Sequence, residues 1–193
     1  MATSQSSQSI TEQERDFLVS HLKRTRKMFL ESIAGLSQAQ LSFKPSDGSW
    51  SIAECAEHIA ISEDIMFYSL TENIMTSPAA PEKRAEVKGQ DELVFKFFAE
   101  RSRKGKAPEP FKPIGRWPTM GALTKHFNES RDRTIAYAQT AQDDLRSHFA
   151  YRPNWAFLKV RDAYQYLLSI PAHAERHIMQ INEIKTHSNF PKN

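Results

Sequence analysis

Apolar and polar residues alternate along much of this chain with the period of an α-helix. The first such stretch carries its apolar stripe at Leu18, Leu22, Phe29 and Ile33. Thr25 fills the one gap in the stripe and is small enough for a half-buried position. Thr11 followed by Glu14 matches a capping box, in which each side chain binds the backbone N–H of the other residue. The pattern predicts a helix over roughly residues 11–35.

A second helix is predicted to begin at Ser51, which matches another capping box with Glu54. Its apolar side consists of Ile52, Cys55, Ile59 and Met66. The prolines that follow residue 77 cannot continue this helix, and residues 77–118 are the least regular part of the chain. Within them, residues 91–104 carry apolar side chains at helical spacing and could form a short helix. Segments of this length inside a domain are usually functional or poorly ordered.

Two further long helices are predicted, over about residues 119–145 and 159–186. The fourth helix contains Pro171, where we expect a kink or a local break. The stretch "SHFAYRPNW" between these helices reads as a loop, and no alternating strand pattern or internal repeat stands out. The chain is therefore predicted to be all-α, a four-helix bundle with a long irregular insertion, residues 77–118, between its second and third helices.

Composition adds limits to this picture. With 193 residues, 39% hydrophobic and 25% charged, the chain fits one globular domain, residues 1–193, whose first ten residues we expect to be flexible. The net charge of +3 is mild, and the basic run "RSRKGK" has no interleaved aromatic residues, so we expect a solvated loop and no nucleic-acid partner. Cys55 is the only cysteine, which excludes an intrachain disulfide. We see no secretory signal or membrane-spanning run and expect a cytoplasmic protein.

Three histidines are the candidates for chemistry. His173 and His177 are four residues apart on the fourth predicted helix, so their imidazoles share one face and can bind one divalent ion. Taken alone, this spacing is a weak signal, because seven histidines give many pairs and satisfied polar residues are the alternative. His58 lies on an inward or half-inward face of the second helix. Three histidines from two facing helices would leave positions open for water or substrate, which is typical of a catalytic metal site.

The strings that carry these histidines resemble the DinB-like superfamily of metal-binding helical bundles, also called YfiT-like. They are "LSFKPSDGSWSIAECAEHIA" and "AHAERHIMQI". The matching residues are Pro45, Trp50, Ser51 and His58 in the first string and His173, His177 and Gln180 in the second. The proline-rich segment 77–118 and Pro171 depart from the family pattern.

The resemblance implies a four-helix bundle, often a homodimer, with a divalent metal such as nickel or zinc bound by His58, His173 and His177. Characterised relatives include transferases and isomerases that use low-molecular-weight thiols. Our leading hypothesis is a metal-dependent S-transferase or hydrolase that acts on a small-molecule substrate. The alternative is a non-enzymatic metal- or ligand-binding dimeric bundle with a stress-related role, because no residue stands out as a general base.

Other residues receive less specific interpretations. Trp50 is expected to anchor the base of the second helix, and Gln180 either binds a ligand imidazole or is a simple polar position. Glu57 and Glu175 do not share a helix face with the neighbouring histidines and should point to solvent. His126 is expected to be a partly exposed histidine rather than a further ligand. Cys55 should be a small buried hydrophobe and not a nucleophile. We also expect metal affinity to fall as the pH drops through about 6.5, because the ligating imidazoles must be neutral.

Overall fold

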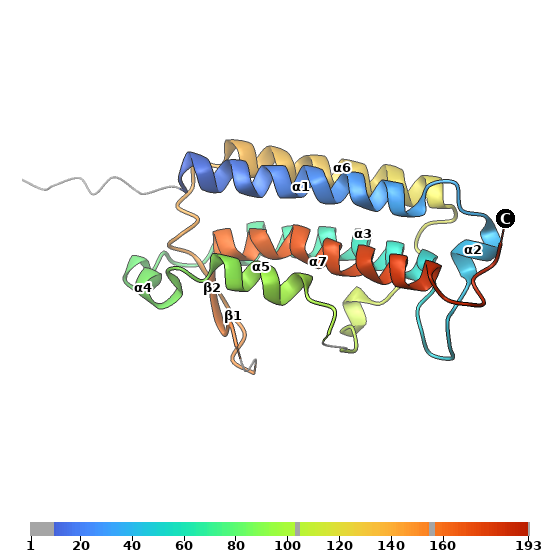
Figure 1. Ribbon diagram of the computed structural model, residues 1–193. Helices are drawn as coiled ribbons and strands as arrows, with labels where there is room; N and C mark the ends of the chain where they lie inside the picture. The colour runs from blue at the N-terminus through green and yellow to red at the C-terminus, as the bar shows by residue number, and fades with distance from the viewer. Residues whose placement is uncertain (1–9, 103–104, 155–156, 193) are drawn as a thin grey trace, which may run out of the picture.

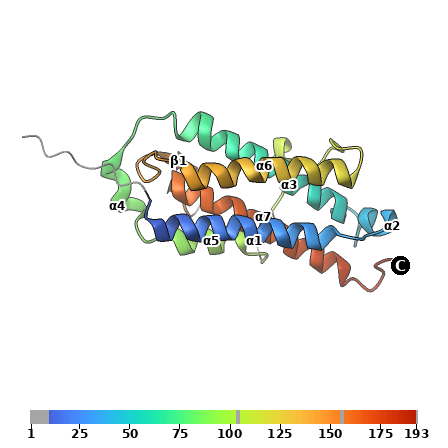
Figure 2. The same ribbon diagram turned by 90° about the horizontal axis from the view of Figure 1, so that it is seen from above.

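Four long helices build the molecule, which we describe from a computed structural model that covers residues 10–102, 105–154 and 157–192. They are α1 (Glu12–Ile33), α3 (Ile52–Tyr68), α6 (Met120–Thr140) and α7 (Ala163–Lys185). The helices α1 and α6 lie side by side above α7 and α3 (Figures 1 and 2). The predicted all-α four-helix bundle is confirmed. The expectation of a flexible N-terminus concerns residues that, except for the buried Ile10, lie outside the described ranges.

The order of the helices around the bundle differs from their order in the chain. Both α1 and α3 pack against α6 and also against α7, whereas α1 and α3 make few contacts with each other. The first and second long helices are therefore diagonal partners, and the second and fourth are neighbours. This arrangement places α3 directly against α7 over much of their length, which is the pair of helices that carries the three candidate histidines.

The predicted helix starts are confirmed at both capping boxes, Thr11 with Glu14 and Ser51 with Glu54. The fourth helix begins later than predicted, because Asp162 caps it in a further box with Gln165. It then runs through Pro171 to Lys185, so the predicted local break is wrong.

The third long helix ends at Thr140, before the predicted residue 145. The polar residues that follow it include Asp144, whose carboxylate accepts a hydrogen bond from the backbone N–H of Arg146. Such short polar side chains bind nearby backbone groups and favour a turn over a continued helix. A stripe of apolar residues does not reveal this competition.

Two short strands follow α6, the first within the predicted loop and the second within residues that were predicted to begin the fourth helix. Strand β1 (Phe149–Tyr151) pairs antiparallel with β2 (Val160–Asp162), with Phe149 opposite Asp162. Each strand has three residues, too few for an alternating pattern to be recognised in the sequence.

The insertion between α3 and α6 contains more regular structure than predicted. A π-helix (Ser69–Ile74) extends α3, and α4 (Arg84–Val87) follows a 3₁₀ turn (Pro81–Lys83). The expected short helix is present as α5 (Asp91–Ala99), which packs along the outer side of α7 (Figure 1). A second 3₁₀ turn, Glu109–Phe111, lies against α3. The small helix α2 (Gln38–Ser42) between α1 and α3 was not predicted.

The bundle interior consists of two apolar clusters. The first contains Leu18, Leu22, Leu70, Leu145 and Leu167 among others, and the second contains Phe29, Ile52, Ile59, Phe127 and Ile178 among others. A buried ion pair, Arg131 of α6 with Glu63 of α3, adds a polar contact inside the bundle. The guanidinium also donates to the Leu22 carbonyl and to the Thr25 hydroxyl, so both charges are hydrogen-bonded. The candidate histidines lie on the helices that carry the second cluster.

Candidate metal centre

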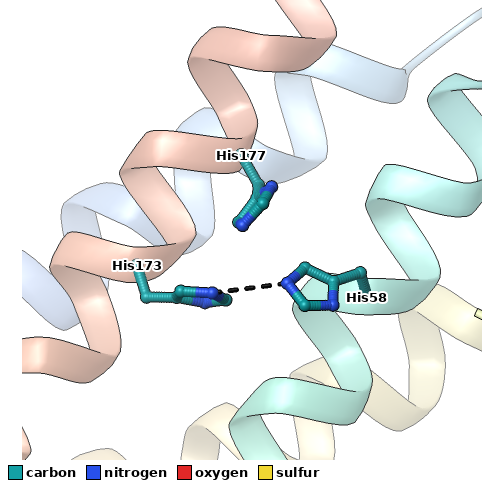
Figure 3. A group of neighbouring side chains, drawn as sticks. All are labelled: His58, His173 and His177. Carbon is teal, nitrogen blue, oxygen red and sulfur yellow. Dashed lines mark hydrogen bonds between the residues drawn. The ribbon is translucent and has the colours of Figure 1, made fainter. Parts of the chain in front are cut away.

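Three imidazole rings converge between α3 and α7. His173 and His177 extend from successive turns of α7, and His58 points toward them from α3 (Figure 3). The ring centroids lie 4.4 Å apart for His58 and His177, 4.6 Å for His173 and His177, and 5.0 Å for His58 and His173. One nitrogen of each ring lies within 4.8 Å of the others. The structure thus brings together all three histidines that the sequence singled out.

The nitrogen spacing suits a transition-metal ion. The Nε2 atoms of His58 and His173 are 3.3 Å apart. Two imidazole nitrogens at about 2.0–2.1 Å from one zinc ion, at a tetrahedral angle, are separated by about 3.3 Å. The donor set of three neutral imidazoles suits nickel or zinc better than magnesium or calcium, which prefer oxygen ligands. The residues therefore fit a divalent ion of the kind that the family resemblance implied.

Hydrogen bonds to the outer nitrogens fix the orientation of two rings. His58 donates from Nδ1 to the backbone carbonyl of Phe111 at 2.6 Å, and His177 donates from Nδ1 to Oε1 of Gln180 at 2.9 Å. A carbonyl oxygen can only accept, so each Nδ1 carries the proton and each Nε2 keeps its lone pair. This tautomer presents Nε2 to a metal, which is how ligating histidines are normally oriented.

The surroundings keep the histidines neutral. Burial lowers the pKa of His58. Burial also holds the pKa of His177 well below its usual range, and the nearby His173 and His58 act in the same direction. Burial lowers the pKa of His173 to about 3, and the nearby His58 and Arg176 act in the same direction. A neutral imidazole has the lone pair that metal binding needs, so the site is preorganised in charge as well as in geometry.

Aromatic groups lie beside the site. The Trp50 ring lies 4.8 Å from that of His58 and 6.1 Å from that of His177, and the Phe111 ring lies 6.5 Å from that of His58. Trp50 precedes the first residue of α3 by two positions and packs against the second apolar cluster, as expected for an anchor at the base of this helix. It also lies against two of the proposed ligands, and the sequence did not predict this contact.

Two of the remaining candidates behave differently from expectation. Glu57 was expected to point to solvent, but it is only 6% exposed, because backbone N–H groups of residues 114–116 bind its carboxylate. Glu175 is also not free in solvent: its side chain is 19% exposed and pairs with Arg24 of α1. Both carboxylates point away from the histidines, as their positions on the helices predicted, but other segments of the chain cover the faces that carry them.

Other assignments are confirmed. Gln180 binds a candidate ligand, His177, as one of its two interpretations required. Burial raises the pKa of the Cys55 thiol to about 12, so this cysteine is a small buried residue and not a nucleophile. His126 is partly exposed and binds Asp64 at 2.6 Å, outside the three-histidine group.

The sequence did not predict two groups that lie around the site. The Phe111 carbonyl is a backbone atom, so no residue type signals its role. Arg101, which lies after α5, reaches Gln180 at 3.3 Å and Glu183 at 2.8 Å. Its position in a basic run suggested a solvated charge, whereas it ties the insertion to α7.

Comparisons with known proteins agree with this fold. The model of the DinB superfamily matches residues 21–181. Among solved structures, YfiT from Bacillus subtilis has a similar fold, with a TM-score of 0.57 and 18% sequence identity over 95% of this chain and 93% of that one. It is described as a probable metal-dependent hydrolase with an unusual four-helix bundle topology. No curated protein matches the chain.

Proposed function

The chain belongs to the DinB superfamily, and from this premise we propose that it is a metal-dependent enzyme acting on a small molecule. His58, His173 and His177 would hold one divalent ion, nickel or zinc, and leave further coordination positions for a substrate. The observation that carries the proposal is the convergence of three neutral imidazoles, two of them with Nδ1 already bound to an oxygen acceptor. The description of YfiT as a probable metal-dependent hydrolase supports the same class of chemistry.

A bound divalent ion supplies Lewis acidity, which lowers the pKa of a water or a thiol in the open position. The protein's own part is to hold the imidazoles neutral and in one tautomer, and to shield one side of the site with Trp50. The thiol of Cys55, one turn before His58 on α3, stays protonated and lies outside the three-histidine group.

A thiol substrate fits the site better than a water nucleophile that depends on a carboxylate base. The two carboxylates nearest to the ligands in sequence are both engaged, Glu57 with backbone N–H groups and Glu175 with Arg24. A metal-bound thiol is deprotonated outright, whereas a metal-bound water keeps a pKa of about 7 and gains more from a neighbouring base. We therefore place transfer of a low-molecular-weight thiol to an electrophile ahead of hydrolysis.

Metal binding is tested by titrating the metal-free protein with Zn²⁺ and Ni²⁺ in a calorimeter. The wild type should bind one ion per chain, and alanine at His58, His173 or His177 should weaken binding at least tenfold, the lower end of the effect of losing a group that merely orients a ligand. His58→Ala should be the mildest of the three, because His173 and His177 share one helix and keep a two-point site. His126→Ala is the matched control and should bind as the wild type does.

Activity is tested by following thiol consumption with electrophilic substrates, and ester hydrolysis in parallel. Turnover that requires the metal and disappears in His173→Ala supports the proposal. One bound ion per chain without turnover of any thiol or ester would favour the non-enzymatic bundle. Loss of metal binding in His126→Ala but not in His58→Ala would refute the site itself.

A further inference from the structure

The carboxylate of Glu57 holds a loop of the insertion through three consecutive backbone N–H groups. Its Oε1 accepts from Ile114 at 3.1 Å and from Arg116 at 2.8 Å, and its Oε2 accepts from Gly115 at 3.0 Å. Glu57 itself is buried, whereas the three residues that donate to it are exposed. The loop therefore lies over Glu57 as a cover, and its polar backbone atoms point inward.

The conformation of the loop explains why it can surround a carboxylate. Gly115 has a φ of +75°, a region that residues with a side chain rarely adopt. Successive N–H groups that converge through such a turn form a concave site for an anion. Hydrogen bonds between N–H groups and an ionised carboxylate are also stronger than those between neutral groups. The loop conformation that Gly115 allows therefore suits the carboxylate of Glu57.

The same loop controls the orientation of a proposed metal ligand. Phe111, three residues before Ile114, accepts the Nδ1–H of His58 at its backbone carbonyl. The chain between them contains Pro113, whose ring restricts the backbone. Glu57 and His58 are adjacent on α3, and so one helix residue fixes the loop while the loop fixes the next helix residue. The contacts form a closed circuit from α3 through residues 111–116 and back to α3.

We infer that Glu57 is a positioning residue of the metal centre: it anchors residues 114–116 so that the Phe111 carbonyl holds His58 in the tautomer that presents Nε2. The inference rests on the proposed function for its purpose, but the tautomer of His58 is a property of the metal-free protein as well. Among the described residues, the Glu57 carboxylate accepts hydrogen bonds from residues 114–116 and not from a histidine, so its effect on His58 passes through the loop.

The test uses two-bond ¹H–¹⁵N correlation spectra of the metal-free protein at neutral pH, which distinguish the two imidazole tautomers. His58 of the wild type should be in the Nδ1–H form. Glu57→Gln replaces one carboxylate oxygen with an NH₂ group, which donates hydrogen bonds and so cannot accept the N–H of Gly115. In this variant, His58 should become a mixture of both tautomers. Zn²⁺ affinity should fall by about tenfold to a hundredfold, as for other groups that orient a ligand.

Glu54→Gln is the matched control. Glu54 lies one turn before His58 on the same helix, and its carboxylate caps Ser51 and pairs with Lys44 without contacting residues 111–116. This variant should lower stability while keeping the His58 tautomer and, within about twofold, the Zn²⁺ affinity. A loss of helix stability alone therefore cannot imitate the effect expected for Glu57→Gln.

A second variant changes the loop and not α3. Gly115→Ala strains the turn at an exposed position and leaves α3 unchanged, and it should reproduce both effects of Glu57→Gln. Wild-type tautomer and wild-type affinity in both variants would overturn the inference. A wild type that binds no Zn²⁺ would overturn the proposed function instead, and the tautomer measurement would still decide the role of Glu57.

Discussion

The free energy of unfolding of the metal-free protein should fall when the pH is lowered, because two buried histidines are held neutral in the folded state. The pKa of His173 is lowered to about 3 and that of His177 lies well below its usual 6.5, in both cases mainly because of burial. In the unfolded chain the same residues return to about 6.5. Below that pH the unfolded state binds more protons than the folded state, so stability falls as the pH falls. Above about pH 7.5 the two histidines have no such effect.

The magnitude follows from linkage. Between pH 7.5 and 5.5, a histidine that is neutral when folded and has a pKa of about 6.5 when unfolded loses about 1.4 kcal/mol of stability. For His173 and His177 together the loss is about 2.7 kcal/mol. This is a large share of the roughly 5–15 kcal/mol by which a domain is usually stable. Burial also lowers the pKa of His58, which can only increase the loss.

The assay is urea unfolding of the metal-free protein at both pH values, for the wild type and for the double variant His173→Gln, His177→Gln. Glutamine stays neutral over this range, so the double variant retains every other pH-dependent contribution. The wild type should lose about 2.7 kcal/mol more than the double variant between pH 7.5 and 5.5. Equal losses, within about 0.5 kcal/mol, would show that these histidines are not held neutral in the fold, and the reasoning from burial would fail.

Three further predictions concern binding and stability. Calorimetric titration should show a Zn²⁺ affinity that changes less than about threefold between pH 7.5 and 6.0. Three histidines with unshifted pKa values of about 6.5 would instead lower the affinity about fiftyfold over this range. The fall in affinity that the sequence led us to expect near pH 6.5 thus moves to lower pH. Gln180→Ala should weaken Zn²⁺ about tenfold or more in the same titration, because His177 loses its acceptor, and an unchanged affinity would argue against that role. Arg131→Met should lower the free energy of unfolding in urea by about 3–5 kcal/mol, because it leaves the buried Glu63 carboxylate without its cation. Adding Glu63→Leu should recover most of this loss. A loss under about 1 kcal/mol in the single variant would contradict this account.

The elements that the sequence predicted well are those set by local rules. Helix starts followed from capping boxes such as Ser51 with Glu54, whose bonds join residues three apart. The pairing of His173 with His177 followed from the helical repeat for the same reason. Helix ends were predicted less well, since the end of α6 depends on competition between the helix and polar side chains of the following turn.

The surroundings of the site depend on contacts between distant parts of the chain. The nitrogen of Ile114 that binds Glu57 is 57 residues away in sequence, and Phe111 lies 53 residues from His58. Neither contact has a sequence signature, because backbone groups make them. The prediction for Glu57 was wrong for this reason: an outward helix face is exposed only where no other segment covers it.

The winding of the bundle connects the fold to the metal centre. In a bundle whose helices follow one another around the ring, the second and fourth would be diagonal and would meet only across the core. Here α3 packs directly against α7, and α1 takes the diagonal position. This contact brings the Nε2 atoms of His58 and His173 to 3.3 Å, and Phe111 and Trp50 lie against the His58 ring. The helices therefore set the positions of the ligand atoms, and the insertion sets the orientation of the ring that α3 contributes. Substitutions on α3 and α7 that move the backbones should affect all three ligands together, whereas substitutions in residues 111–116 should act on His58 alone.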